Sequence, residues 1–318
     1  MKIVIMEPLG IGLEKVQNLM ASLQTAGHQV VYYESKELDQ EKLLARVRDA
    51  EIIMLANQPL SAKIIEGCPK LRMLSVAFTG VDHISLQACR ERNIMVCNAA
   101  GYSTNAVAEL TFGLAIALIR NIVPCDERTR SAGTKDGLVG FELCGKTFGI
   151  VGTGAIGTKV AHIAQAFGCR VIAYSRTPKK ALQDAGVVYL PLEQLLAQAD
   201  FVSLHVPLTE ATKNLIDAEA IGKMKRSAVL LNTARGGVVD SEALAEALNS
   251  GRLAGAGIDV FENEPPILST HPLCQAKNTV LTPHVAFASR EALEVRAEIV
   301  FKNIEQWLAG APQNMVIC

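Results

Sequence analysis

The sequence is poor in the residues that mark several large classes of protein. Aromatic residues make up only 5% of the 318 residues, with a single tryptophan, so no platform for stacking nucleic-acid bases is expected. An excess of charge of one sign is also missing, because 31 Lys and Arg residues are balanced by 32 Asp and Glu residues. A chain so close to neutral lacks the basic surface that binds nucleic acids or anionic membranes. We therefore expect the partner to be a small molecule.

Signals for secretion, membrane insertion and metal binding are absent as well. The amino-terminal MKIVIMEP has no long apolar region of a signal peptide, and the most apolar helical stretch, 106–119, is too short to span a bilayer. The eight cysteines are scattered, with no CxxC pair and no metal-like spacing to histidine. A composition of 49% hydrophobic and 20% charged residues excludes a disordered chain. We expect a cytoplasmic protein with a large core and no metal.

Apolar segments of strand length alternate with segments of helix length along the chain. Strands are expected at 2–6, 29–33, 51–56 and 73–77, and helices at 14–27, 39–49 and 61–66. After Gly145 the alternation restarts, with strands at 147–151, 170–174, 201–205, 228–232, 255–259 and 279–281, and helices at 156–167, 192–198, 241–248 and 290–308. This rhythm predicts an α/β protein with two doubly wound, Rossmann-like units, each built on its own parallel sheet.

A glycine pattern in the second half of the chain is the first specific sign of a ligand. Gly152, Gly154 and Gly157 form GTGAIG directly after the expected strand 147–151 and at the start of a helix. In a dinucleotide site the first glycine permits a tight turn, the second lets the backbone approach a pyrophosphate, and the third lets helix and strand pack. A glycine-rich turn without a ligand is the alternative. The strand–turn–helix context and the next strand, 170–174, favour the dinucleotide site.

The segment after the strand 170–174 favours NADP over NAD as the cofactor. An NAD site usually has Asp or Glu about 20 residues after the first glycine, where the acid binds the ribose 2′-hydroxyl. Here the residues are Ser175, Arg176 and Thr177, followed by Pro and two lysines, with no carboxylate. A 2′-phosphate finds a guanidinium and hydroxyls there without repulsion from a carboxylate. The alternative is that these charges only form a solvated loop.

Side chains at the ends of three expected strands provide the chemistry of hydride transfer to a 2-keto acid. Arg235 follows the strand 228–232, several carboxylates lie at and after the end of 255–259 (Asp259, Glu262 and Glu264), and His284 follows 279–281. Each is weak evidence alone. Together they supply a cation for the substrate's carboxylate and carbonyl, a proton donor, and a carboxylate that stabilises the protonated imidazole.

The order of the motifs carries a family resemblance. The segments GTGAIG, HVPLT, NTARGG, AGIDVFENEPP and TPHVAFAS resemble the D-isomer-specific 2-hydroxyacid dehydrogenase family over nearly the whole chain. The resemblance implies that a dinucleotide-binding domain, 98–287, is inserted into a substrate domain, 1–97 plus 288–318. It also implies an NAD(P)-dependent dehydrogenase or reductase acting on the D-isomer.

The same resemblance implies roles for individual residues. Arg235, Glu264 and His284 correspond to the catalytic residues, and Asp259 to the acceptor for the nicotinamide carboxamide. The substrate is expected at Thr79, Gly80, Arg235 and His284, with backbone amides of the loop 79–82 binding its carboxylate. Motifs and resemblance together place the cofactor contacts at Thr79, Gly152, Gly154, Ala155, Ile156, Gly157, Ser175, Arg176, Thr177, Val206, Pro207, Thr212, Thr233, Ala234 and Asp259.

Departures from the family pattern bear on the substrate. Members acting on 3-phosphoglycerate usually have Arg-Ser after the third strand, where this chain has Asn57 and Gln58. The segment VAFAS after His284 resembles the glyoxylate/hydroxypyruvate reductase (glycerate dehydrogenase) branch, which with Arg176 implies reduction by NADPH. Alternatives are a dehydrogenase for lactate, 2-hydroxyisocaproate or 3-phosphoglycerate, or a dinucleotide-sensing regulator on the same scaffold. The apolar helix beginning near Asn105 resembles the family's dimer-forming element, which implies a homodimer through the dinucleotide-binding domain.

Overall fold

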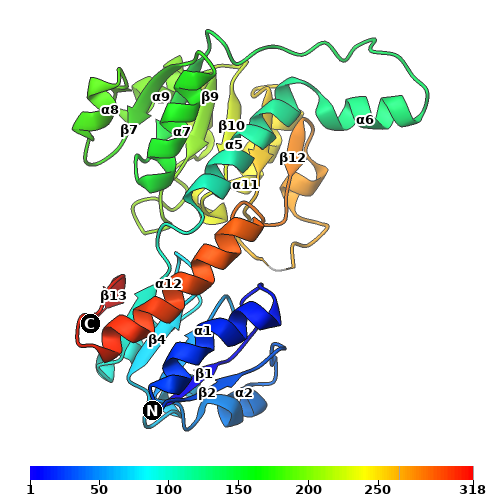
Figure 1. Ribbon diagram of the computed structural model, residues 1–318. Coiled ribbons are helices and arrows are strands. Elements are labelled where there is room, and N and C mark those ends of the chain that lie inside the picture. The colour runs from blue at the N-terminus through cyan, green and yellow to red at the C-terminus, as the bar shows by residue number, and fades with distance from the viewer. Residues whose placement is uncertain (265, 318) are drawn as a thin grey trace. The chain divides into compact units, whose positions relative to one another are not determined.

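The chain forms two compact units, each built on one β-sheet. The computed structural model (Figure 1) describes residues 1–264 and 266–317. Unit 1 comprises Met1–Ser103 and Ala288–Cys318, and unit 2 comprises Thr104–Phe287. Residues 98–103, which the family resemblance assigns to the second domain, belong to unit 1 here. The physical reason is that this segment continues an inner strand of the first sheet, 95–98, and the N–H of Ala99 donates to Phe78 O at 3.0 Å.

The sheet of unit 1 has the strand order β13-β5-β4-β3-β1-β2. Its strands are β1 (Lys2–Ile5), β2 (Gln29–Tyr32), β3 (Ile52–Leu55), β4 (Met73–Val76), β5 (Met95–Asn98) and β13 (Met315–Ile317). Neighbouring strands are parallel except for β13, which pairs antiparallel with β5. The prediction of a purely parallel sheet is therefore wrong at this edge. A strand of three residues is too short to show a pattern of its own, and only its partner β5 defines it.

Helices cover this sheet and bury the apolar side chains of its strands. They are α1 (Leu13–Thr25), α2 (Gln40–Val47), α3 (Ala62–Glu66), α4 (Leu86–Glu91) and α12 (Arg290–Leu308). The α2 helix begins where Asp39 accepts hydrogen bonds from the N–H groups of Glu41 and Lys42, as expected for an N-cap. The strands β3 and β4 are buried along their whole length, which explains why they read as continuous apolar runs rather than alternating ones.

The sheet of unit 2 is entirely parallel, with the order β12-β11-β10-β9-β6-β7-β8. Its strands are β6 (Thr147–Val151), β7 (Arg170–Tyr174), β8 (Val188–Tyr189), β9 (Phe201–Leu204), β10 (Val229–Asn232), β11 (Gly255–Ile258) and β12 (Thr279–Leu281). The chain moves from β6 outward to β8 and then returns to place β9 on the other side of β6. Ligands of such sheets bind at the carboxyl ends of the strands beside this reversal.

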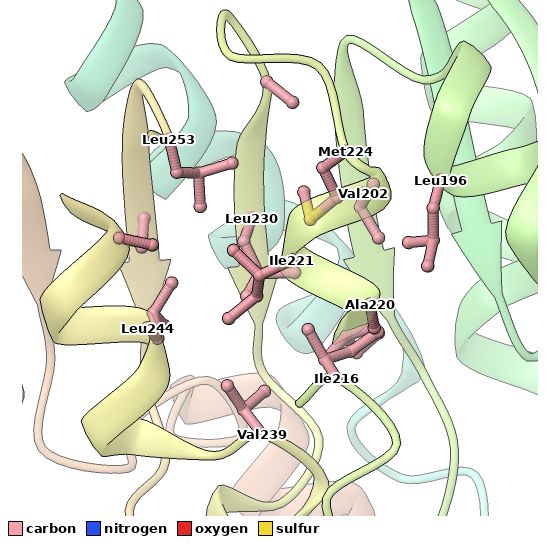
Figure 2. Packing of buried hydrophobic residues seen from close by; sticks show 14 of the residues in the cluster. Leu196, Val202, Ile216, Ala220, Ile221, Met224, Leu230, Val239, Leu244 and Leu253 are labelled. Atoms are coloured by element: carbon pink, nitrogen blue, oxygen red, sulfur yellow. The ribbon is translucent and has the colours of Figure 1, made fainter. Parts of the chain in front are cut away.

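Helices on both faces of the second sheet complete unit 2. They are α5 (Thr104–Ile119), α6 (Ile122–Arg130), α7 (Ala155–Ala166), α8 (Lys180–Asp184), α9 (Leu192–Gln198), α10 (Ala218–Lys223) and α11 (Ser241–Asn249), with 3-10 turns at Gly236–Val238 and Pro272–Gln275. Figure 2 shows Ile221 of α10 and Leu244 of α11 directed toward Leu230 of β10. This packing fixes where β10 ends, and therefore where the residues that follow it lie.

The α6 helix differs from the other helices because none of its residues is buried. It projects from unit 2 together with the loop that returns to β6 (Figure 1). Across the part of the chain that the structure describes, no single helix is long and apolar enough to cross a membrane. Together, α5 and α6 have the length and composition of a membrane span, but the two helices are bent by 58° relative to each other.

Candidate active site

The glycine loop lies between β6 and α7, where the strand order reverses. Gly152 has a φ of +96°, and a Cβ there would lie 2.5 Å from the carbonyl oxygen of His205, which follows β9. A Cβ at Gly157 would lie 2.0 Å from Gly152 O. By contrast, a Cβ at Gly154 would meet no atom within 4 Å. The first and third glycines are therefore required by packing, whereas the second borders open space at the start of α7. Ala155 and Ile156 form the first turn of α7 beside this space.

The basic segment after β7 is tethered to the glycine loop. The Lys179 ammonium donates to Thr158 Oγ1 at 3.0 Å and to Gly154 O at 3.4 Å. The Tyr189 hydroxyl accepts from the N–H of Lys179 at 3.0 Å and donates to Thr153 Oγ1 at 3.1 Å. Ser175 is half-buried, whereas Arg176 and Thr177 are exposed. The contacts thus tie Lys179, which follows these three residues, to the glycine loop.

Five further predicted cofactor residues, from Val206 to Ala234, follow β9 and β10. Thr212 stabilises the loop after β9, because its hydroxyl donates to Pro207 O at 2.6 Å and accepts from the N–H of Thr209 at 2.8 Å. Val206 approaches the glycine loop, since its Cγ1 lies 2.8 Å from the Cβ position of Gly152. Thr233 and Ala234 follow β10.

The segment after β10 is anchored by hydrogen bonds at both predicted cofactor residues. Thr233 is buried, with its hydroxyl 3.1 Å from that of Thr111 on α5, and the N–H of Ala234 donates to Asn232 Oδ1 at 3.1 Å. The structure thus brings all the predicted cofactor residues that follow β6, β7, β9 and β10 to the carboxyl edge of one sheet.

His284 and Glu264 form a close pair although 20 positions separate them in the sequence. The imidazole Nδ1 lies 2.5 Å from Glu264 Oε1, while Glu264 Oε2 accepts from the N–H of Phe261 at 3.1 Å. The His284 side chain is 33% exposed and that of Glu264 is 16% exposed. With Nδ1 bound to the carboxylate, Nε2 is the nitrogen left to exchange a proton with a substrate.

Asp259 fixes the backbone that carries His284. Its carboxylate is fully buried and accepts from Thr282 Oγ1 at 2.6 Å, from the N–H of Val285 at 2.9 Å and from the N–H of Ala286 at 2.9 Å. Burial raises the pKa of Asp259, and these hydrogen bonds and the nearby His284 oppose that rise. His284 itself has a φ of +52°, a conformation that a non-glycine residue keeps only when its surroundings enforce it. A positioning role for Asp259 is not evident from the sequence.

Arg235 and Glu264 line one cleft of unit 2, with a volume of about 550 Å³. Arg235 directly precedes a 3-10 turn, and its Nη1 donates to Ala234 O at 2.7 Å. A Cβ on the next residue, Gly236, would lie 2.1 Å from the carbonyl carbon of Phe261. The segments that carry Arg235 and Glu264 therefore pack directly on one another, so the two side chains share a site.

A second set of side chains, centred on Glu262, supports the loop 260–264. Glu262 accepts from Ser241 Oγ at 2.6 Å and lies 2.9 Å from His271 Nε2. These hydrogen bonds lower the pKa of Glu262 against the effect of burial. The ring of His271 meets Phe261 edge-on, with centroids 5.1 Å apart. Glu262 thus anchors the segment that presents Glu264.

Unit 1 contains the loop predicted to bind the substrate, which follows β4. Thr79 is exposed and Gly80 is half-buried. Near the end of β3 the structure adds a cation that the sequence did not reveal. The Lys36 ammonium lies 2.5 Å from Asn57 Oδ1 and 3.5 Å from Glu7 Oε2. Lys36 precedes Asn57 by a helix and a strand, so only the fold places it there. Its charge is balanced by the buried Glu7.

No group of His, Cys, Asp and Glu side chains suited to a metal ion occurs among residues 1–264 and 266–317. Every cysteine in these ranges is a free thiol. Burial raises the pKa of four of these thiols, Cys68, Cys89, Cys97 and Cys169, to about 11. These four are uncharged at neutral pH and buried, so they pack as small apolar side chains.

Residues 112–286 match the family model described as "D-isomer specific 2-hydroxyacid dehydrogenase, NAD binding domain". The chain is 40% identical to a glycerate dehydrogenase of Methylorubrum extorquens, over 91% of this chain and 92% of the relative. It is 41% identical to a glyoxylate reductase of Korarchaeum cryptofilum, over 86% of this chain and 85% of the relative. Among solved structures, an acyclic imino acid reductase (Bsp5) in complex with NADPH and D-Arg matches with a TM-score of 0.89 and 29% identity, over 100% of both chains.

Proposed function

Because the chain belongs to the D-isomer specific 2-hydroxyacid dehydrogenase family, and is therefore an NAD(P)-dependent oxidoreductase, we propose that it reduces glyoxylate and hydroxypyruvate with NADPH. The products are the corresponding 2-hydroxy acids, in the D configuration where C2 is a stereocentre. The observation that carries this proposal is the contact of 2.5 Å between His284 Nδ1 and Glu264 Oε1, with Arg235 lining the same cleft as Glu264. The relatives named glycerate dehydrogenase and glyoxylate reductase support the choice of substrate.

The catalytic roles follow from the chemistry of these side chains. The nicotinamide, when bound, supplies a hydride to C2 of the keto acid. Arg235 binds the carboxylate and polarises the carbonyl. His284 Nε2 gives its proton to the carbonyl oxygen, so that the hydride and the proton together yield the alcohol. Glu264 stabilises the protonated ring and sets its orientation through Nδ1. Thr79 and Gly80 of unit 1 contribute backbone N–H groups for the carboxylate.

The dinucleotide binds on residues whose geometry fits its parts. The open space beside Gly154 and the first turn of α7 at Ala155 and Ile156 accept the pyrophosphate. We assign NADP as the preferred cofactor because Ser175, Arg176 and Thr177 offer donors to a 2′-phosphate. The tether from Lys179 to Thr158 keeps this segment beside the glycine loop. The complex of the Bsp5 reductase with NADPH is consistent with this choice, and NAD is the alternative.

Cofactor preference is tested with Arg176→Ala and a matched variant, Arg170→Ala. Arg170 is also exposed and begins β7, whereas Arg176 follows the other end of that strand. Loss of a charge-assisted contact with the 2′-phosphate should raise the KM for NADPH about tenfold and leave the KM for NADH nearly unchanged. Arg170→Ala should change neither. A wild-type enzyme that prefers NADH would contradict the choice of NADP.

The reaction is tested by following NADPH oxidation with a panel of keto acids. The panel contains glyoxylate, hydroxypyruvate, pyruvate, 2-ketoisocaproate and 3-phosphohydroxypyruvate. Fast turnover of the first two supports the proposal. Preference for another member keeps the mechanism and changes the substrate to that of a lactate, 2-hydroxyisocaproate or 3-phosphoglycerate dehydrogenase. No turnover with tight dinucleotide binding would favour a dinucleotide-sensing regulator.

We assign a homodimer through unit 2, and the exposed apolar side chains of the α6 region support this. Ile122 and Val123 are 50% and 48% exposed, Val139 is 86% exposed and Phe141 is 40% exposed. A helix of nine residues with none buried is not stable alone in water. We therefore expect a second copy of the chain to pack against it. Sedimentation velocity should show a dimer that Val123→Asp dissociates. A wild-type monomer would refute the assignment.

We also assign the protein to the cytoplasm, which the free thiols of residues 1–264 and 266–317 support. Cell fractionation followed by immunoblotting tests this location. Recovery in a secreted or membrane fraction would contradict it.

A further inference from the structure

Four residues of unit 2 form a closed ring of hydrogen bonds beside the glycine loop. Tyr189, the last residue of β8, donates its hydroxyl to Thr153 Oγ1 at 3.1 Å and accepts from the N–H of Lys179 at 3.0 Å. The Lys179 ammonium donates to Thr158 Oγ1 at 3.0 Å, and that hydroxyl donates to Thr153 O at 3.2 Å. The ring joins the glycine loop, α7, β8 and the segment that follows β7. None of the sequence motifs assigned a role to Tyr189.

The ring holds one end of the basic segment 175–179, and β7 holds the other. At the first end, Tyr174 O accepts from the N–H of Gly152 at 2.7 Å. At the second end, Lys179 is the N-cap of α8 and belongs to the ring. Between these anchors, the side chains of residues 175–177 make no hydrogen bond within the described part of the chain. Their donors remain available to a ligand, and the two anchors determine where those donors lie.

The backbone transmits the position of Lys179 to Arg176. Pro178 has a fixed φ and also restricts the conformation of the residue before it, Thr177, so the segment has little freedom to absorb a movement of Lys179. The α8 helix cannot replace the ring as the anchor. It has five residues, and Leu182 in its middle is the buried one, so its exposed start depends on hydrogen bonds to keep its place.

We propose that Tyr189 is a positioning residue for the 2′-phosphate of NADP, because its hydroxyl fixes the segment 175–179 against the glycine loop. This inference rests on the proposed function, which places the 2′-phosphate at residues 175–177. Tyr189 acts through its two hydrogen-bond partners, Lys179 and Thr153. Without the hydroxyl the donors of residues 175–177 are no longer held together around the phosphate. The pyrophosphate site at the start of α7 keeps its backbone geometry, because the packing of the glycines sets it.

Titration calorimetry with two nucleotides tests the proposal on the full chain. Adenosine 2′,5′-bisphosphate and adenosine 5′-monophosphate differ only in the 2′-phosphate, so the ratio of their Kd values isolates its contribution. Tyr189→Phe keeps the aromatic ring and removes the hydroxyl. The Kd of the bisphosphate should rise about tenfold, the factor for one hydrogen bond, while the Kd of the monophosphate is nearly unchanged. Steady-state kinetics should show the same split, with a higher KM for NADPH and a nearly unchanged KM for NADH.

The matched control is Tyr32→Phe. Tyr32 is the last residue of β2, an edge strand of unit 1, as Tyr189 is the last residue of β8, an edge strand of unit 2. The control should leave both Kd values unchanged. The ratio of the Kd values also separates positioning from stability. A purely structural role for Tyr189 would lower the Tm and change both Kd values by the same factor, which leaves their ratio at the wild-type value.

A second pair of variants opens the ring from its other side. Thr158→Val has nearly the shape of threonine but cannot accept from the Lys179 ammonium, so the Kd of the bisphosphate should rise as it does in Tyr189→Phe. Thr158→Ser keeps the hydroxyl and should keep the wild-type ratio. If Tyr189→Phe fails to fold, this pair carries the test alone, and equal ratios in the wild type, Thr158→Val and Thr158→Ser overturn the inference.

The outcomes distinguish this inference from the proposed function. A wild type that prefers the bisphosphate, with an unchanged ratio in Tyr189→Phe, overturns the role of Tyr189 and leaves the choice of NADP intact. A wild type that binds the two nucleotides equally overturns both the choice of NADP and this inference.

Discussion

Replacing Glu264 by Gln tests the central feature of the site, because it removes a charge and keeps the shape. Glu264 Oε1 lies 2.5 Å from His284 Nδ1, so the pair forms a charge-assisted hydrogen bond when the ring is protonated. Such a bond contributes about 1.5–3 kcal/mol, against about 0.5–1.5 kcal/mol for a neutral one. The variant therefore loses about 1.4 kcal/mol of stabilisation of the protonated ring, which is a factor of about ten.

The weaker stabilisation of the protonated ring should change the pH profile of the reduction in one direction. Reduction needs the protonated ring as proton donor, so kcat/KM for the keto acid falls as the pH rises. With the proton held less tightly, the fall of kcat/KM should begin at a lower pH in Glu264→Gln than in the wild type. Activity should then be about tenfold lower at pH 8 and closer to that of the wild type at low pH.

The assay is NADPH oxidation from pH 5.5 to 9, with Glu262→Gln as the matched control. Glu262 lies two residues away and contacts Ser241 and His271 rather than His284. The control should lower activity without moving the pH at which activity falls. Superimposable pH profiles for wild type and Glu264→Gln would refute the assignment of Glu264 as the partner of the proton donor.

Three further predictions concern other parts of unit 2. Gly152→Ala should lower both the affinity for NADPH and the Tm measured by calorimetry, because its Cβ would lie 2.5 Å from a carbonyl oxygen. Gly154→Ala should lower the affinity for NADPH alone. Equal losses of Tm in the two variants would contradict this prediction. Burial lowers the pKa of His205 to about 3. Below about pH 6.5 the imidazole of His205 is therefore protonated in the unfolded chain and neutral in the folded one. Stability should fall by about 1.4 kcal/mol per pH unit from there toward pH 3, and His205→Gln should remove this slope in urea titrations. At pH 8 iodoacetamide should alkylate the exposed Cys144 and leave Cys169, whose thiol has a pKa near 11, unmodified until unfolding, as peptide mass spectrometry would show.

Much of the fold could be predicted because its signals are local. The final helix was predicted at 290–308 and is observed over the same range. Apolar runs also placed ten of the strands to within a few residues, whereas β5, β8 and β13 were not predicted. The prediction failed where an element depends on a distant partner. The three-residue β13 exists because it pairs with β5.

The sequence by itself determined the chemistry that is available. The order of GTGAIG, Arg235, Glu264 and His284 along the chain indicates a dinucleotide, a cation, a carboxylate and a proton donor. Each of these signals lies within a short segment, because the end of a strand and the start of a helix are set by a few neighbouring residues.

Only the tertiary structure decided which of these groups meet and what holds them. Asp259 binds the turn that carries His284, Lys36 reaches Asn57, and Tyr189 joins Lys179 to Thr153. Such contacts leave no periodic trace in the sequence, because a hydrogen bond between distant segments depends on the positions that packing imposes on both. The family motifs therefore identify the reacting groups, and the fold supplies the hydrogen bonds that fix their geometry.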